Sequence, residues 1–304
     1  MRSEQTHSAE RDVDAALVAT LIAAQFPQWA NLPVVQLPSA GTDHAMYRLS
    51  DDMVVRLPRM PGVARQVDTE QRWLPHLAPH LPLQVPVLLG RGVPGQGFPM
   101  QWSVYDWLDG ENAFDRPIVD MRDAAIVLGG FVAALRRVDV TGGPQSFRGG
   151  PVSASGYDVR APIRDLGADG TIDGEAATAA WEQVLALPQW AGEPGWLHGD
   201  LMPGNLLTRH GRLTGIIDFG VLGIGDPACD LIPAWYLFGG DTRELFRTAA
   251  DVDDITWARG RGWALCLGLG AAHYYRTKNP ALATVGRRAM LEALADYRSE
   301  FGSR

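Results

Sequence analysis

Cysteine is scarce in this 304-residue sequence, with only Cys229 and Cys266 present. Both lie in apolar stretches, and a reducing compartment would keep them as small buried thiols, so neither a disulfide framework nor a cysteine metal site is expected. Long apolar runs are also missing. The longest nearly uncharged stretch, Trp263 to Tyr275, is interrupted by glycine and is shorter than the roughly 20 residues that cross a bilayer. We therefore expect no association with a membrane.

Clusters of basic residues and a secretory signal are lacking as well. The N-terminus has no apolar run that ends at a small-residue cleavage site, so we expect a cytoplasmic chain. With 27 Lys and Arg against 35 Asp and Glu, the net charge is −8. This balance does not provide the cationic surface that a nucleic acid requires. It favours a neutral or cationic small molecule as partner, and it leaves open whether the chain is a monomer or a homodimer.

Apolar residues are abundant, and their periodicity changes along the chain. Hydrophobic residues make up 46% of the sequence and charged residues 20%, which suffices for two compact units. A helix is expected over residues 10–26, followed by short strands over 34–38, 45–49 and 53–57 that turn-rich segments separate. Three consecutive strands of this kind predict an antiparallel meander.

A second helix is expected over residues 63–77, where apolar side chains recur in steps of three and four. The position on this stripe between Val67 and Leu74 is Glu70. Burial of an unpaired carboxylate costs several kcal/mol, so Glu70 needs a cation opposite it. Arg56, in the third expected strand, is the candidate.

The remaining pattern divides the chain into two lobes. We expect an N-terminal lobe at 1–102, a hinge at 103–110 and a C-terminal lobe at 111–304. Helices are expected in the C-terminal lobe over 120–137, 174–186, 227–238, 254–275 and 280–300. A β-hairpin over 205–219, with its turn at Arg209-His210-Gly211, interrupts them. The expected fold class is therefore α+β, with a small antiparallel β lobe and a larger, mostly helical lobe.

Residues 196–220 contain the densest polar pattern. His198-Gly199-Asp200 is followed after four residues by Asn205, and Asp218 opens an Asp-Phe-Gly tripeptide after the hairpin. Phosphoryl transfer from ATP needs a carboxylate that orients the acceptor hydroxyl, and a carboxamide and a second carboxylate that hold Mg²⁺ against the phosphates. Asp200 is the candidate for the first role, and Asn205 and Asp218 are the candidates for the second. The alternative is a hairpin whose Asp and Asn residues only cap turns.

Upstream elements occur in the order that a kinase requires. A turn containing Gly41 and Thr42 is the candidate phosphate loop, Arg56 the candidate phosphate-contacting cation, and Glu70 the acid that orients it. Each element alone is weak evidence, because Gly41-Thr42 is equally a plain hairpin turn and Arg56 could be an outward-facing strand residue. Their order ahead of His198 is what favours the kinase interpretation.

Together these motifs resemble the aminoglycoside phosphotransferase family, small-molecule antibiotic kinases with a protein-kinase-like, two-lobed fold. The residues that carry the resemblance are His198-Gly199-Asp200 with Asn205, Ile216-Ile217-Asp218-Phe219-Gly220, and Gly225-Asp226-Pro227 with Asp230-Leu231. The resemblance implies that Asp200 is the catalytic carboxylate. Asn205 and Asp218 fall on the family's magnesium ligands. We include His198 among the catalytic candidates. His198 and Asp230 fall at the positions where the family braces the catalytic loop.

The resemblance also implies ATP as the phosphoryl donor, with GTP as an alternative, and Mg²⁺ as the metal. The adenine would lie against the hinge backbone at Asp106, Trp107 and Leu108. The sequence departs from the family's pattern at two positions that would contact the phosphates. Arg56 stands where many relatives have lysine, and the phosphate loop has one glycine, Gly41. The implied activity is phosphorylation of a hydroxyl group on an aminoglycoside or related antibiotic, which would confer resistance.

Other functions stay open at this point. A protein kinase is disfavoured because no Ala-Pro-Glu tripeptide follows Asp-Phe-Gly. Metabolic kinases of the same fold, which act on choline, homoserine or fructosamine, and macrolide kinases share the core motifs. A nucleotide-binding pseudokinase is disfavoured because Asp200, Asn205 and Asp218 are all present.

Two groups of residues in the C-terminal part have both a functional and a structural interpretation. Asp251, Asp253 and Asp254 could face an amine-bearing substrate, although Asp254 is also well placed to cap a helix. Aromatic side chains could stack on a sugar or macrocycle, or could belong to the core. These aromatic residues are Trp235, Tyr236, Trp263, Tyr274 and Tyr275.

Overall fold

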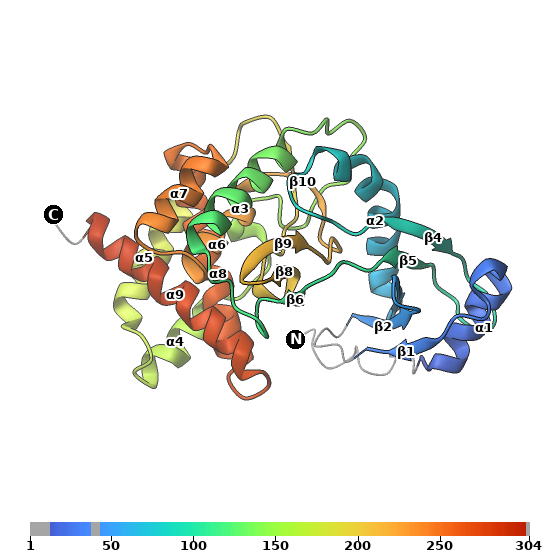
Figure 1. Cartoon of the computed structure of the whole chain (residues 1–304). Coiled ribbons are helices and arrows are strands. Elements are labelled where there is room, and N and C mark those ends of the chain that lie inside the picture. Colours follow the sequence, from blue (N-terminus) through green and yellow to red (C-terminus); the bar gives the residue numbers. More distant parts are fainter. Residues whose placement is uncertain (1–12, 38–42, 302–304) are drawn as a thin grey trace. The chain divides into compact units, whose positions relative to one another are not determined.

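The structure is a computed structural model that describes residues 13–37 and 43–301. Gly41 and Thr42, the candidate phosphate loop, lie outside the described residues. The chain forms two compact units, which we treat separately (Figure 1). Unit 1 comprises residues 1–79 and 84–109, and unit 2 comprises residues 80–83 and 110–304. Within the described residues, no helix is long and apolar enough to span a membrane.

An antiparallel sheet is the base of unit 1. Among the described residues it has five strands in the order β1-β2-β3-β5-β4. They are β1 (Val34–Gln36), β2 (His44–Leu49), β3 (Met53–Pro58), β4 (Leu88–Gly92) and β5 (Trp102–Asp106). Since β1, β2 and β3 are consecutive antiparallel neighbours, the predicted meander is confirmed.

Strand β4 was not predicted, because its buried positions are glycines and it shows no apolar alternation. A Cβ atom at Gly92 would meet the Trp102 ring at 2.0 Å, and one at Gly90 would meet the Phe26 ring at 2.9 Å. The aromatic rings therefore fill the space that strand side chains would normally occupy. The apolar residues that stabilise β4 come from elsewhere in the sequence.

The two helices of unit 1 pack on opposite faces of its sheet. Helix α1 (Ala15–Gln25), capped by Asp14, shares a core cluster with Val55 and Leu57 of β3. Helix α2 (Ala64–Leu77) contacts β4 and β5. Because side chains alternate along a strand, Arg56 lies on the face opposite to Val55 and Leu57, and it meets α2 there.

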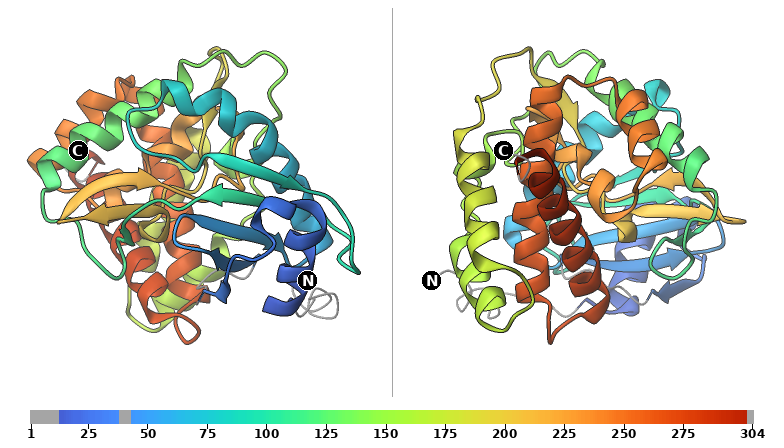
Figure 2. Two further views of the ribbon diagram at one scale, coloured as in Figure 1. Left: turned by 45° about the vertical axis from the view of Figure 1, so that its right-hand side comes forward. Right: turned by 90° about the vertical axis from the view of Figure 1, so that its left-hand side faces the viewer.

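Unit 2 is mostly helical. Its longer helices are α3 (Met121–Arg136), α4 (Arg160–Ala168), α5 (Gly174–Ala186), α7 (Asp241–Ala250), α8 (Asp254–Tyr274) and α9 (Pro280–Phe301). Figure 2 shows α8 and α9, coloured orange to red, packed side by side. The prediction for 227–238 was partly wrong, since the chain forms a 3₁₀ turn at Pro227–Leu231 and then one short helix, α6 (Pro233–Tyr236).

Helices α4 and α7 were not predicted, and both have sparse apolar patterns. Helix α7 buries only Phe246 and Ala250 among its residues, so the sequence shows no continuous stripe. Helix α4 has only nine residues and contains Pro162 and Gly167. Such short helices are stabilised by tertiary packing more than by their own propensity.

The predicted hairpin of unit 2 is present. It consists of β8 (Leu206–Arg209) and β9 (Arg212–Ile216), and β6 (Glu111–Asn112) pairs with β8. His210 and Gly211 have φ values of 53° and 76°, as a two-residue type I′ turn requires. A separate pair is formed by β7 (Gly195–Leu197) and β10 (Gly223–Gly225).

Adjacent glycines in α3 provide a matched test of helix packing. A Cβ at Gly129 would lie 2.6 Å from the carbonyl oxygen of Phe246 in α7, whereas a Cβ at Gly130 would meet no described atom within 4 Å. We expect Gly129→Ala to lower the free energy of unfolding by about 1–3 kcal/mol, because α7 must move. Gly130→Ala should be neutral or stabilising by up to about 1 kcal/mol. Urea unfolding measures both, and equal effects would contradict the packing argument.

Candidate active site

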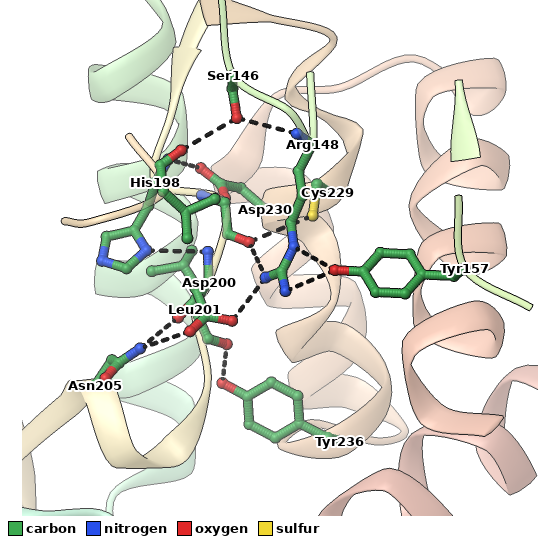
Figure 3. A network of polar contacts seen from close by, with 12 residues as sticks. Ser146, Arg148, Tyr157, His198, Asp200, Leu201, Asn205, Cys229, Asp230 and Tyr236 are labelled. Carbon is green, nitrogen blue, oxygen red and sulfur yellow. Dashed lines mark hydrogen bonds and ion pairs between the residues drawn. The ribbon is translucent and has the colours of Figure 1, made fainter. Parts of the chain in front are cut away.

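His198, Asp200 and Asn205 meet in unit 2 (Figure 3), in the segment between strand β7 and the hairpin of β8 and β9. Strand β7 ends directly before His198, and the hairpin starts after Asn205 and ends before Asp218. The Ile217 N–H donates to the carbonyl oxygen of Asn205 at 3.0 Å. The pairing of β8 with β9 thus returns the chain to Asn205 just before Asp218.

Asp200 and Asn205 are linked directly. The Asn205 amide nitrogen donates to the Asp200 backbone oxygen at 2.8 Å and to Asp200 Oδ2 at 3.2 Å. This orientation turns the amide oxygen of Asn205 away from Asp200. The side chain can therefore hold the carboxylate with its nitrogen and offer its oxygen to a cation.

Asp218 is exposed and has a positive φ of 63°. A non-glycine residue in this region carries roughly 1–3 kcal/mol of strain and persists only where its surroundings fix it. The residues on both sides are fixed, since Ile217 is bonded to Asn205 and the buried Phe219 ring lies 4.6 Å from the His198 ring. The backbone conformation of Asp218 is thus fixed from both sides.

The site offers few protein ligands to a metal ion. Within the described residues, no three His, Cys, Asp or Glu side chains form a potential metal cluster. A carboxylate at Asp218 and an amide oxygen at Asn205 suit Mg²⁺, which prefers oxygen ligands and commonly binds through one or two protein groups plus substrate phosphates. The donor set fits an ion that arrives with a nucleotide better than a permanently caged metal.

His198 is fully buried, and both ring nitrogens are used inside the loop. The Asp200 N–H lies 3.1 Å from Nδ1, and Nε2 lies 3.1 Å from the carbonyl oxygen of Ile217. The ring therefore accepts at Nδ1 and donates from Nε2. Burial lowers its pKa, which favours this neutral form. The arrangement suits a side chain that positions Asp200, and it presents no nitrogen to a substrate.

Asp230 anchors the backbone of the same loop through two hydrogen bonds. Its Oδ2 and Oδ1 accept from the N–H groups of His198 and Gly199, both at 2.7 Å. Burial raises the pKa of Asp230 to about 7, and the two N–H donors oppose this rise. Gly199 has a φ of 81°, and a Cβ there would lie 2.6 Å from Val221 Cγ1. Glycine at this position is required by both backbone conformation and space.

Sequence reasoning missed Arg148, which contacts the candidate catalytic carboxylate. Its Nη1 donates to Asp200 Oδ1 at 2.7 Å and to the Gly199 carbonyl oxygen at 2.6 Å. Burial alone would lower the pKa of Arg148, but the Asp200 charge, the interactions with Cys229 and Tyr157 and the hydrogen bond to Asp200 together outweigh burial, so the pKa is raised. The two partners are 52 positions apart in the sequence. Nothing in the local pattern around Arg148 signals this contact.

In unit 1, the predicted pairing of Glu70 with Arg56 is present. Arg56 Nη1 lies 2.7 Å from Glu70 Oε1 and 2.9 Å from Oε2, and the two residues are 9% and 2% exposed. The Tyr105 hydroxyl donates to Glu70 Oε2 at 3.2 Å. Burial, and then the Glu70 charge, raise the pKa of Tyr105. The carboxylate is thus held from two sides and fixes the guanidinium on its own face of the sheet.

Two of the three candidate hinge residues use their backbone N–H groups within unit 1. Asp106 N–H donates to Val87 at 3.0 Å, and Trp107 N–H donates to Asp52 at 2.7 Å. The Asp106 side chain accepts from Val87, and burial raises its pKa. Of the three backbone N–H groups, that of Leu108 is therefore the candidate donor to adenine.

The acidic residues near α8 have structural partners. Asp253 caps the helix by accepting from Thr256 N at 2.6 Å, so the prediction that Asp254 is the cap was wrong by one residue. Asp254 pairs with Arg247. Asp251 accepts from Arg137 at 2.7 Å. These contacts favour a structural role for the group over binding of an amine.

Most of the aromatic candidates are core residues. Trp235, Tyr236 and Trp263 are at most 3% exposed, whereas Tyr274 is 55% exposed and stacks edge-on against Tyr275. Tyr236 also donates its hydroxyl to the backbone oxygen of Leu201. Tyr236 thereby links helix α6 to the loop that carries Asp200.

A family model for the phosphotransferase enzyme family, APH, matches residues 34–297. The chain belongs to this family. The resemblance stated from the motifs is thus confirmed, and the match covers both units. Among curated relatives of this phosphotransferase, the uncharacterized protein YcbJ of Bacillus subtilis (strain 168) is 27% identical over 255 residues, which cover 75% of this chain and 77% of YcbJ.

Solved structures show that the fold of this phosphotransferase is the two-lobed, kinase-like one. The GDP complex of wild-type aminoglycoside 2'-phosphotransferase-IIIa matches with a TM-score of 0.68 at 19% identity, covering 94% of this chain and 100% of that one. Macrolide 2'-phosphotransferase MphH from Brachybacterium faecium, an apoenzyme, matches with a TM-score of 0.59 at 24% identity, covering 91% and 97%. The predicted α+β fold class is confirmed.

The buried brace can be tested without any substrate. Asp230→Asn places an amide N–H₂ against one of two backbone N–H groups, so we expect the free energy of unfolding to fall by about 2 kcal/mol or more. Asp158→Asn is the matched control, since exposed Asp158 accepts a hydrogen bond from Arg160 N–H just before α4, and the side-chain oxygen of asparagine can accept the same bond. Equal stability of both variants in urea unfolding would remove Asp230 from its anchoring role.

Proposed function

We propose that this phosphotransferase transfers the terminal phosphoryl group of ATP or GTP to a hydroxyl group of a small molecule, of the aminoglycoside or related antibiotic kind. The observation that carries the proposal is the arrangement of Asp200. Its two carboxylate oxygens are held by Arg148 and Asn205, and the hairpin returns the chain to Asn205 at Ile217, one residue before Asp218. The carboxylate keeps a partly exposed position, with 33% of its side chain accessible.

In this proposal Asp200 orients the acceptor hydroxyl and receives its proton as the phosphorus–oxygen bond forms. Phosphoryl transfer has a largely dissociative transition state, so alignment and neutralisation of charge supply most of the acceleration. Mg²⁺ held by Asn205 and Asp218 would neutralise charge on the phosphate oxygens. His198 and Asp230 act through the backbone of the loop, which they keep in the conformation that directs Asp200 outward.

Unit 1 would supply the nucleotide contacts. Arg56 is fixed by Glu70, and its planar, permanently charged fork suits phosphate oxygens. The Gly41-Thr42 turn stays the proposed phosphate loop, and the backbone of Leu108 the proposed adenine contact. Structures with the same fold support nucleotide binding, since they include GDP, ADP and ATP complexes of aminoglycoside phosphotransferases.

The proposal that the acceptor is an antibiotic of this kind rests on the same structural relatives and on the net charge of the chain. Their complexes contain kanamycin, gentamicin and streptomycin, and two are macrolide phosphotransferases. A net charge of −8 favours a cationic acceptor over an anionic one. Phosphorylation would replace a donor hydroxyl of the drug by a group of about −1.5 to −2 charge, which would prevent binding to its target.

The proposal is tested by measuring ADP and GDP release with Mg²⁺ and a panel of acceptors. The panel contains aminoglycosides, tuberactinomycin peptides, macrolides and amino-alcohol metabolites. Turnover with an antibiotic supports the proposal. Turnover with only the metabolites would identify a metabolic kinase, and tight magnesium-dependent nucleotide binding without turnover would identify a pseudokinase.

The role of Asp200 predicts a specific kinetic change. Asp200→Asn keeps the size of the side chain and removes its basicity, so we expect kcat to fall by at least about a hundredfold while nucleotide affinity changes little. Asp173→Asn is the control, because Asp173 is a helix cap of α5 whose function asparagine preserves. Undiminished turnover of Asp200→Asn would exclude Asp200 as the catalytic carboxylate.

The buried pair of unit 1 allows stability to be separated from function. Glu70→Leu alone leaves Arg56 buried without its carboxylate partner, so we expect a loss of about 3–5 kcal/mol in the free energy of unfolding. The double variant Arg56→Met, Glu70→Leu should recover most of this stability but not kcat/KM for the nucleotide. If the double variant recovers both, the pair has a structural role only.

A further inference from the structure

We propose that Arg148, held by Tyr157, is a positioning residue that fixes the Asp200 carboxylate for phosphoryl transfer. The inference rests on the proposed function of Asp200. It concerns two residues that no motif identified, and both lie in the irregular segments between α3 and α4 in unit 2. Figure 3 shows the guanidinium of Arg148 between Asp200 and the hydroxyl of Tyr157.

The backbone that carries Arg148 is firmly attached to the β10 segment. Ser146 N–H donates to Ile224 at 3.1 Å, and the Ser146 hydroxyl donates to the Val221 carbonyl at 3.1 Å. Gly149 accepts from Asp226 N–H at 2.8 Å, and a Cβ at Gly149 would lie 2.8 Å from the Ile224 carbonyl oxygen. The Cα of Arg148 is therefore held on both sides, and its side chain extends from a fixed point.

The guanidinium is held along two edges. Nη1 bonds to Asp200 Oδ1 and to the Gly199 carbonyl oxygen at 2.7 and 2.6 Å. On the other edge, Nε and Nη2 lie 3.3 and 3.1 Å from the Tyr157 hydroxyl oxygen. A planar group with fixed donors can rotate only if it breaks several of these bonds at once. Tyr157 thus sets the direction in which Nη1 meets Asp200.

Arg148 completes the restraint on the carboxylate. Asn205 bonds to Asp200 Oδ2 and Arg148 to Oδ1, so both oxygens have a partner and the plane of the carboxylate is defined. Without Arg148, the carboxylate is free to turn about its side-chain bonds while the Asn205 contact adapts. A displacement of about 1 Å in a reacting group can cost about a hundredfold in rate. The arrangement therefore predicts an effect on kcat.

A purely structural ion pair would behave differently. The side chain of Arg148 is 14% exposed and that of Asp200 is 33% exposed, so removal of Arg148 also affects stability. A structural role alone would lower stability and leave kcat per folded molecule unchanged. A role in binding phosphate would raise KM for the nucleotide and leave kcat unchanged. The positioning role lowers kcat and leaves KM for the nucleotide nearly unchanged.

The test compares three variants with one control. Arg148→Gln removes the charge and the fork, Arg148→Lys restores a charge without the fork, and Tyr157→Phe removes only the hydroxyl that aligns it. Arg160→Gln is the control, because the Arg160 side chain is 80% exposed and its nearest acidic partner, Glu182, is 3.9 Å away. The wild-type protein and each variant are assayed with MgATP and an acceptor identified in the ADP-release panel, and also with MgATP and water alone.

We expect Arg148→Gln to lower kcat by about tenfold to a hundredfold, with KM for MgATP within about twofold of the wild-type value. Arg148→Lys should recover part of the loss, Tyr157→Phe should show a smaller loss in the same parameter, and Arg160→Gln should show none. Tyr157→Phe decides the question if Arg148→Gln fails to fold. An unchanged kcat in Arg148→Gln would overturn the proposal, and so would a change in KM for MgATP without a change in kcat. If Arg148→Gln does not fold, the same two outcomes in Tyr157→Phe would overturn it.

A crystal structure separates this inference from the proposed function. In Arg148→Gln, or in Tyr157→Phe in its place, Asp200 should adopt a different or a mixed side-chain rotamer. If Asp200 keeps its position there, Arg148 does not position it, whatever the activity. If the rotamer changes but the wild-type chain turns over no acceptor and does not hydrolyse MgATP, the proposed function fails and the geometric part of the inference stands.

Discussion

The candidate active site depends on one buried carboxylate that holds an irregular loop. Asp230 accepts from two successive backbone N–H groups, which no regular element satisfies, and so fixes the start of the loop that carries Asp200. The other supports follow from this anchor. The neutral ring of His198 fills the space between Asp200 and the hairpin, and Gly199 provides the backbone conformation that allows both N–H groups to face Asp230.

The same physical device occurs in both units. A buried guanidinium opposite a carboxylate is stable only with several well-directed bonds, because desolvation of the two charges is expensive. In unit 1 Arg56 meets Glu70, which also accepts from Tyr105, and in unit 2 Arg148 meets Asp200. The cost of burying the two guanidinium groups is understandable if each fixed charge serves a reaction on phosphates, and Asp200 differs from Glu70 in keeping a partly exposed carboxylate.

Local sequence patterns predicted those parts of the fold and of the site whose residues lie close together in the sequence. The hairpin at 205–219, the meander, the Glu70 stripe and α5 (Gly174–Ala186) were found because periodicity and turn residues reflect backbone geometry directly. Strand β4 and helix α7 were not found, because partners distant in sequence complete their cores. The cap at Asp253 was assigned one residue too late, since neighbouring aspartates offer the same signal.

The sequence by itself determined the family and the fold class. It also predicted Asp200, Asn205 and Asp218 as the candidate site residues, because their spacing reflects a loop and a hairpin that follow one another along the chain. Only the tertiary structure showed that Arg148 meets Asp200 and that His198 has both nitrogens engaged. The reason is physical: a side-chain contact between segments 52 positions apart depends on how two loops pack, and no local periodicity records it.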